Sequence, residues 1–247
     1  LDHLGEEVSE AGEARAATEV YLDALDRINE RGVDTNISAK PTQLGLKVDR
    51  ELCEQNFTAI IERAAKYNNF VRMDMEGSDC TEDTLHIFYR LRKKYDNVGI
   101  VIQTLLRRSE EDVDEILRIG GRIRLCKGAY KEPKEIAFSK RPEVDASFER
   151  LMEKLLKSGI YHGMATHDER LIEKTKQFAR ENDIPKETFE FQLLYGIRTE
   201  LARQLIKDGY NVRIYIPFGQ QWYPYFMRRL AERPANLFFF LKNFLRA

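Results

Sequence analysis

Two adjacent arginines lie in the middle of a short helix predicted near the C-terminus. The segment YPYFMRRLAERP covers Tyr223–Pro234, with Pro224 as its second residue and Pro234 as its last. Proline is compatible with the first turn of a helix but not with its interior, so the helix is predicted between these two prolines. The i, i+3, i+4 and i+7 spacing places four side chains on one face: Tyr225, Arg228, Arg229 and Glu232. This face either binds an anionic ligand or is solvated, with Glu232 pairing with Arg228.

A second group of polar residues stands at the ends of short strand-forming runs. In chain order these residues are Lys40, Asp74, Gln103, Lys127, Thr166, His167 and Tyr215. Any one of them has a structural alternative, such as a helix N-cap or a solvated strand end. Together they indicate a site, because catalytic groups of parallel barrels come from the carboxyl ends of the strands.

Arg124 differs from this group because it lies within a strand pattern, RIRLCKGAY, where it alternates with apolar residues. A guanidinium directed into a barrel needs an acceptor, since an unpaired buried charge is strongly destabilising. Lys127 adds positive charge nearby, and Gly128 and Ala129 leave room for a ligand to approach the backbone. These features favour a planar, anionic ligand.

Eight strand-like runs alternate with amphipathic helical patterns over the whole chain. The runs cover residues 1–5, 35–40, 70–76, 98–106, 121–130, 161–168, 189–196 and 211–219, and clear helical patterns cover 49–67, 81–95 and 168–182. This order predicts a single (β/α)8 barrel domain over residues 1–247. An open doubly wound sheet is the alternative, which is weakened because no strand is followed by GxGxxG or a P-loop.

The composition is that of a globular protein. The 247 residues are 33% charged and 43% hydrophobic, and 40 basic against 41 acidic side chains give a net charge of −1, so we expect no nucleic-acid partner. Three separated cysteines favour a reducing cytoplasm over a disulfide framework, and we predict no metal site. The chain opens without a signal sequence and within a strand-like run, so we expect some N-terminal residues to be missing.

Seven motifs carry a resemblance to a known family. They are ISAKPTQLG, MDMEG, RIRLCKGAY, ATHD, FQLLYG, RIYIPFG and YFMRRLAER. Their order and spacing resemble proline dehydrogenase, and the chain looks most like its monofunctional bacterial type. The resemblance implies a distorted (β/α)8 barrel with the final helix lying over the barrel mouth. It also implies an FAD enzyme that oxidises L-proline to Δ1-pyrroline-5-carboxylate and passes the electrons to a quinone.

The resemblance also implies a role for each residue. The substrate-binding set is Lys40, Leu194, Tyr215, Tyr225, Arg228, Arg229 and Glu232, in which the three cations bind the proline carboxylate and the apolar groups wall the ring. The catalytic set is Arg124, Tyr215, Lys40 and Asp74, with Arg124 beside flavin N5. The FAD-binding set is Gln103, Arg124, Lys127, Gly128, Ala129, Tyr130, Thr166 and His167.

Three other readings stay open at this point. Lys40 at a strand end could form the imine of a Schiff-base aldolase. The substrate could be a related cyclic imino acid such as hydroxyproline. The apolar segment NLFFFLKNFLRA at residues 236–247 could make this a binding protein, or could give a cytoplasmic enzyme transient contact with the inner face of the cell membrane, although it could equally be the last helix packed on the barrel.

Overall fold

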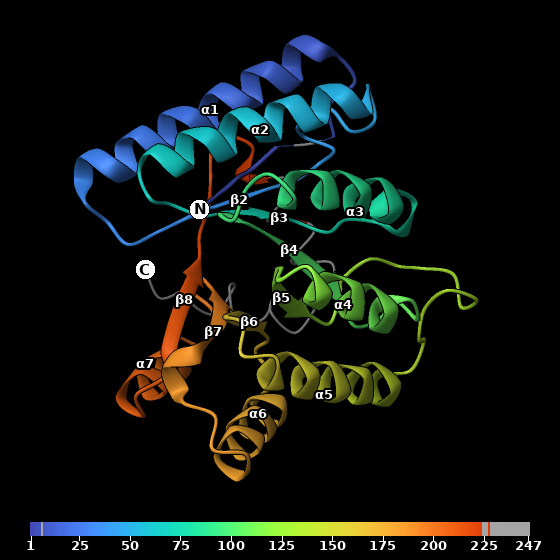
Figure 1. The fold of residues 1–247 in the computed structure, drawn as a ribbon, viewed down its shortest axis with the longest axis vertical. Coiled ribbons are helices and arrows are strands. Elements are labelled where there is room, and N and C mark those ends of the chain that lie inside the picture. The colour runs from blue at the N-terminus through green and yellow to red at the C-terminus, as the bar shows by residue number, and fades with distance from the viewer. Residues whose placement is uncertain (6, 224–226, 228–247) are drawn as a thin grey trace, which may run out of the picture.

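A single parallel sheet runs through the computed structural model, which describes residues 1–5, 7–223 and 227 (Figure 1). Its strands are β1 (Asp2–His3), β2 (Ile37–Ala39), β3 (Val71–Met73), β4 (Val98–Gln103), β5 (Arg122–Cys126), β6 (His162–Ala165), β7 (Phe189–Leu194), β8 (Asn211–Tyr215) and β9 (Pro217–Phe218). Every predicted run contains a strand. Each strand is shorter than the run that predicted it.

The sheet closes into a barrel through its last two strands. β8 and β9 are separated only by Ile216, so β9 continues β8. β8 pairs with β7, and β9 pairs in parallel with β1. The Asp2 amide donates to the Ile216 carbonyl at 3.1 Å, and the Leu4 amide donates to the Phe218 carbonyl at 2.7 Å. β8 and β9 are therefore one chain segment, and the predicted (β/α)8 barrel is confirmed.

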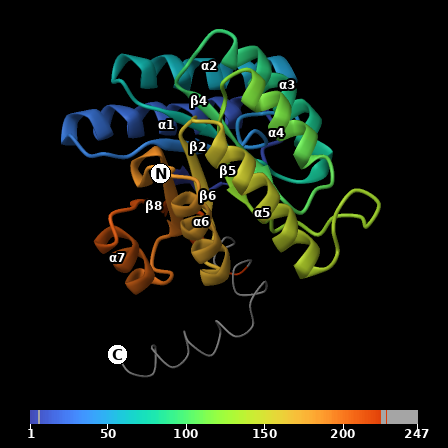
Figure 2. The same cartoon turned by 60° about the horizontal axis from the view of Figure 1, so that its bottom comes forward.

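Seven α-helices of the described residues connect successive strands and cover the outside of the sheet (Figure 2). They are α1 (Ala11–Arg31), α2 (Arg50–Lys66), α3 (Ser78–Arg92), α4 (Ser109–Arg118), α5 (Arg141–Lys157), α6 (Glu169–Glu181) and α7 (Thr199–Lys207), with a short 3-10 helix at Lys186–Thr188. Side-chain caps fix some helix starts: Asp49 accepts from the Leu52 amide at 2.7 Å, and Asp168 accepts from the Arg170 amide at 3.2 Å. Apart from Met227, the helix predicted between Pro224 and Pro234 lies outside the described residues.

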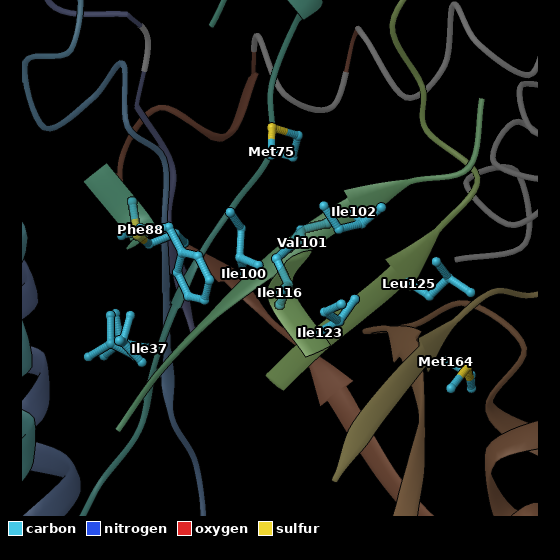
Figure 3. Close-up of a cluster of buried hydrophobic side chains, with 14 of the residues drawn as sticks. Ile37, Met75, Phe88, Ile100, Val101, Ile102, Ile116, Ile123, Leu125 and Met164 are labelled. Atoms are coloured by element: carbon cyan, nitrogen blue, oxygen red, sulfur yellow. The ribbon is translucent and has the colours of Figure 1, made fainter. Parts of the chain in front are cut away.

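The hydrophobic core lies between the sheet and the helices. Ile100 and Ile102 of β4 lie directly beside Ile123 and Leu125 of β5, and they pack toward apolar residues of α3 and α4 such as Phe88 and Ile116 (Figure 3). Side chains alternate across a strand, so the residues between these positions face the barrel interior. Many of those residues are polar, so the barrel interior holds the buried polar groups and most of the hydrophobic stabilisation lies outside the barrel.

We expect Gly99→Ala to destabilise the barrel. A Cβ at Gly99 would lie 2.6 Å from the Arg122 carbonyl oxygen and 2.7 Å from the Phe70 ring, so β4 and β5 would have to move. Overpacking of this kind costs about 1–3 kcal/mol in the free energy of unfolding, measured by urea denaturation. Gly12→Ala is the control, because a Cβ there meets nothing within 4 Å and alanine favours helix. Equal stability of the two variants would contradict this packing.

Candidate active site

A buried ion pair occupies the centre of the barrel. Arg124 of β5 donates through Nη1 to Oδ1 of Asp74, which directly follows β3, at 2.9 Å. Both residues are buried, with exposed fractions of 7% and 8%. Residues 50 positions apart in sequence meet because alternation directs both side chains inward from nearby strands. The acceptor that Arg124 requires is therefore Asp74.

Three further groups hold the Arg124 guanidinium in place. Ser38 of β2 accepts from Nη1 at 2.9 Å and donates its own proton to Asp74 Oδ1. Gln192 of β7 accepts from Nε. The ring of Tyr215 lies 5.0 Å from the guanidinium carbon, within cation–π range. A planar cation fixed by contacts from four strands or strand ends cannot rotate without breaking several of them.

The amide of Gln192 has one orientation because of its second partner. Its Nε2 donates to Glu190, whose two carboxylate oxygens also accept from Arg213 Nε at 2.9 Å each. The amide oxygen must therefore face Arg124. Gly163 of β6 provides the space, since a Cβ there would come within 2.4 Å of Gln192 Nε2. An ion pair on β7 and β8 thus supports the central pair.

Lys40, immediately after β2, is bound by carboxylates at the edge of the same cluster. Its Nζ donates to both carboxylate oxygens of Asp2 at 2.7 Å and lies 3.9 Å from Asp74 Oδ2. Burial on its own lowers the pKa of the Lys40 ammonium, but Asp2 and Asp74 outweigh it and the pKa is raised. Lys40 is therefore a cation at neutral pH rather than a neutral amine.

Asp74 remains ionised although it is buried. Burial on its own raises the pKa of this carboxyl, but Arg124 and Lys40, together with hydrogen bonds from Ser38 and Tyr215, lower it below the ordinary value. The Tyr215 hydroxyl donates to Oδ2 at 3.0 Å, and burial followed by the charges of Asp74 and Asp2 raises the pKa of the phenol well above its usual value. The tyrosine is accordingly a neutral donor.

Lys127 heads a separate charged cluster after β5. Its Nζ lies 2.5 Å from Asp145 and 2.9 Å from Asp168, and these carboxylates also bind Arg170 and Arg141. Burial on its own raises the pKa of Asp168, but these cations outweigh it and lower the pKa. The Lys127 charge is thus balanced by protein carboxylates, and its ammonium is held in a fixed position.

The other residues expected to contact a cofactor follow β4, β5 and β6. Gln103 Nε2 donates to the Glu76 carbonyl at 2.7 Å, and the Thr166 hydroxyl accepts from the Asp168 amide at 3.1 Å. Gly128 has a φ of +94°, and a Cβ there would lie 2.0 Å from Leu105. The space beside this glycine is therefore filled by Leu105, so the turn itself requires glycine.

His167 and Leu194 connect β6 with β7 at the same end of the barrel. The Leu194 amide donates to His167 Nε2 at 3.0 Å, so this nitrogen is unprotonated. Ala129 follows Gly128, and the Tyr130 side chain beyond it is exposed. Four further predicted residues lie outside the described part of the chain: Tyr225, Arg228, Arg229 and Glu232.

Sequence reasoning missed four members of the central cluster: Asp2, Ser38, Glu190 and Gln192. The signal was available for Ser38, Glu190 and Gln192, because each is a polar residue at an inward position of a strand, two residues from another inward polar group or one predicted as such. Asp2 carried no such signal, since the residue two positions later is Leu4. Arg124 was identified as a polar residue at an inward position of a strand pattern, and the same criterion would have found Ser38, two residues before Lys40. It would also have found the alternating pair Glu190 and Gln192.

A surface groove of about 600 Å3 lies between the N-terminal turns of α5 and α6. It is next to the Lys127 cluster and does not include the residues around Arg124. Arg141, Arg170 and Lys174 line it together with Asp145 and Glu149. The described residues contain no group of three or more His, Cys, Asp or Glu side chains arranged to hold a metal ion. No helix among them is both long enough and apolar enough to span a bilayer.

We expect Asp74→Asn to lower stability sharply, because it leaves Arg124 and Lys40 buried beside a neutral group. Breaking a buried pair from one side costs about 3–5 kcal/mol in the free energy of unfolding, measured by urea denaturation at pH 7. Asp79→Asn is the matched control, since Asp79 forms a largely exposed pair with Lys47 worth under about 1 kcal/mol. A loss at Asp74 no larger than that at Asp79 would contradict the buried pair.

Known proteins resemble the chain over almost its whole length. The family model for proline dehydrogenase matches residues 1–241. Proline dehydrogenase 2 of Bacillus subtilis (strain 168) is 43% identical over 243 residues, which is 98% of this chain and 80% of that protein. Proline dehydrogenase of Deinococcus radiodurans is 36% identical over 251 residues, covering 100% of this chain and 81% of that protein.

A solved structure agrees with these sequence matches. The crystal structure of proline utilization A from Bdellovibrio bacteriovorus, inactivated by N-propargylglycine, superposes with a TM-score of 0.87 and 26% identity over 93% of this chain and 29% of that chain. The matched part is a barrel like the one described above. With the sequence matches spanning nearly every residue and the polar barrel interior in place, the chain belongs to the proline dehydrogenase family.

Proposed function

We propose that this chain is an FAD-dependent enzyme that oxidises L-proline to Δ1-pyrroline-5-carboxylate and transfers the electrons to a quinone. Family membership supports proline as the substrate. The single observation that carries the rest is the fixed cation Arg124 at the centre of the barrel, with Asp74, Lys40 and Tyr215 around it. Lys40, Asp74 and Tyr215 stand at the carboxyl ends of their strands, where barrel enzymes hold their ligands.

The residues present fit a flavin. Donors of suitable chemistry stand at or just after the ends of three adjacent strands: the Gln103 amide, the Lys127 ammonium and the Thr166 hydroxyl. This hydroxyl accepts from the Asp168 amide and keeps its own proton to donate. The residues that would hold the cofactor are Gln103, Arg124, Lys127, Gly128, Ala129, Tyr130, Thr166 and His167. FAD supplies the hydride acceptor when it is bound. Arg124 would contribute a positive charge beside the reacting atoms, where it would stabilise the negative charge that develops.

Proline binding is assigned to the cations and apolar groups of the site. Lys40, whose raised pKa keeps it charged, would bind the carboxylate together with Arg228 and Arg229. Leu194, Tyr215 and Tyr225 would wall the ring, and Asp74 and Glu232 would orient the cations. Fixing the carboxylate fixes the ring, and a cationic pocket lowers the pKa of the substrate amine so that its free base forms.

The same observations weigh against the two other substrate chemistries. A Schiff-base lysine must be a neutral amine, which is favoured by a lowered pKa, whereas Lys40 has a raised pKa and binds two carboxylates. For hydroxyproline, the added hydroxyl would meet apolar walls formed by Leu194 and the Tyr215 ring and would lack a partner. We therefore infer a preference for proline.

The quinone acceptor suggests where the enzyme acts. We infer a cytoplasmic protein that contacts the inner face of the cell membrane transiently through the apolar residues 236–247. Membrane quinones dissolve in the bilayer, and an apolar segment that also contains Lys242 and Arg246 suits its interface.

We expect the purified protein to carry non-covalent FAD. Its donor set can bind the cofactor without a covalent linkage, so heat or acid denaturation should release all of the flavin into the supernatant. Absorbance and chromatography against FAD and FMN standards identify what is released. Colourless protein that takes up no added flavin, or that releases FMN alone, would rule out FAD as the cofactor.

We expect Arg228→Met and Arg229→Met each to reduce kcat/KM for proline by about 30- to 1,000-fold. Each removes a charge-assisted hydrogen bond to a buried carboxylate, worth roughly 2–4 kcal/mol. The flavin spectrum should be unchanged, and lysine at either position should restore activity only in part, because an ammonium lacks the planar fork.

Arg203→Met is the control for that comparison, since Arg203 lies on the exposed surface of α7 in a pair with Glu200. Values within about threefold of wild type at both Arg228 and Arg229 correspond to less than about 1 kcal/mol, as for a surface pair. That result would exclude the arginine face from the substrate site.

A further inference from the structure

Glu76 is a buried acid that joins two of the segments at the carboxyl end of the barrel. It follows Asp74 by two residues, in the segment after β3, and its exposed fraction is 8%. Its Oε2 accepts from the Thr42 backbone amide at 2.9 Å, and its Oε1 accepts from the Thr42 hydroxyl at 2.7 Å. A single carboxylate therefore binds both donors of one residue in the segment after β2.

Thr42 lies two residues after Lys40, so this contact bears on the position of the lysine. Pro41 lies between them and its ring fixes φ, which makes the link short and stiff. The Leu44 amide donates to the Lys40 carbonyl at 3.2 Å. The Leu46 amide donates to the Pro41 carbonyl at 3.0 Å. In a turn closed by these bonds, a shift of Thr42 would be transmitted to the backbone of Lys40.

The segment that carries Glu76 is itself held by further contacts. The Glu76 backbone carbonyl accepts from Gln103 Nε2, at the end of β4, at 2.7 Å. Two residues further along, Ser78 donates through its amide and its hydroxyl to Glu132, in the segment after β5. The segment after β3 is thus tied to the ends of β4 and β5, so Glu76 is a fixed support for Thr42.

Lys40 needs such a support because its side chain does not fix its own position. A lysine has a flexible stem of four carbons, and ordering that stem costs conformational entropy. Asp2 and Asp74 bind the ammonium group, but these contacts restrain only the end of the side chain. The contact between Thr42 and Glu76 restrains the backbone from which the stem begins.

The burial of Glu76 is costly, which argues against an incidental contact. Burial raises the pKa of its carboxyl, and the hydrogen bonds from Thr42 and the charge of Lys40 offset this only in part. An apolar side chain would occupy a buried position without that cost. The gain that the acid provides is the pair of hydrogen bonds to Thr42, which an apolar residue could not make.

We propose that Glu76 is a positioning residue for the substrate carboxylate, because by binding Thr42 it holds Lys40 where the ammonium can bind that carboxylate. This inference rests on the proposed function, in which Lys40 binds proline, and extends it to a residue that acts through Lys40. The role depends on geometry more than on charge. Glutamine can therefore replace Glu76, since its amide oxygen accepts from the Thr42 amide and its amide nitrogen donates to the Thr42 hydroxyl.

The experiment measures binding of cyclopentanecarboxylate to the purified, flavin-loaded full chain by isothermal titration calorimetry. This probe has the ring and carboxylate of proline but no amine, so it cannot be oxidised at a C–N bond. Glu76→Ala should raise the Kd by about 10- to 100-fold, and Glu76→Gln should stay within about threefold of wild type. In turnover of proline by Glu76→Ala, KM should rise more than kcat falls, because carboxylate binding is common to the ground and transition states.

A Lys40→Met background tests whether the effect passes through Lys40. There, Glu76→Ala should change the Kd by less than about twofold, because no ammonium is left to position. The same loss in both backgrounds would contradict a role through Lys40. Asp112→Ala is the matched control, since Asp112 is a buried acid of α4 with an exposed fraction of 7% that pairs with Arg108 at 2.9 Å. Its Kd should equal that of wild type even if its Tm falls.

Thr42→Val removes one of the two hydrogen bonds and decides the matter if Glu76→Ala does not fold. It should raise the Kd by about 3- to 10-fold, as expected for one hydrogen bond. An unchanged Kd in Glu76→Ala or Thr42→Val, or equal losses in Glu76→Gln and Glu76→Ala, would overturn the positioning role alone. A wild-type protein that neither oxidises proline nor binds the probe would overturn the proposed function, and this inference with it.

Discussion

The buried pair of Asp74 and Arg124 is the interaction on which the rest of the barrel interior depends. Two opposite charges removed from water gain from each other only when the geometry is good and the remaining donors and acceptors are satisfied. Here Ser38, Gln192 and Tyr215 supply those partners from three other strands. The strands that carry these partners must therefore keep their relative positions for the pair to be stable. The pairing of β1 with β9, which closes the barrel, helps to fix those positions.

The two faces of the sheet perform different tasks. The outward face, with Ile100, Ile123 and Phe191, packs on the helices and provides most of the hydrophobic stabilisation. The inward face holds arginines, carboxylates and amides that contribute little net stability but fix the positions of charges. This division lets a charged site lie within a stable protein, because the core that maintains the fold does not include the groups that we propose to contact ligands.

The architecture could be predicted because it depends on local patterns. Alternating strand-like and helical runs are visible in the sequence, and the register of a strand such as RIRLC makes Arg124 conspicuous. The pairing of Arg124 with Asp74 could not be predicted, because it depends on how far each strand is staggered around the barrel. The same limit hid the two carboxylates that neutralise Lys127, since Asp145 and Asp168 belong to different helical segments. The roles of Tyr225, Arg228, Arg229 and Glu232 stay predictions.

We propose that Asp74 and Arg124 act as one unit in the oxidation of proline, and a double-mutant cycle on kcat/KM for proline tests this proposal most directly. The cycle compares wild type, Asp74→Asn, Arg124→Met and the double variant, each at matched flavin occupancy. The account predicts a coupling energy of about 2 kcal/mol or more, so that the second substitution has little further effect after the first. Losses that multiply, with a coupling energy below about 0.5 kcal/mol, would show that the two residues act independently and would contradict the account.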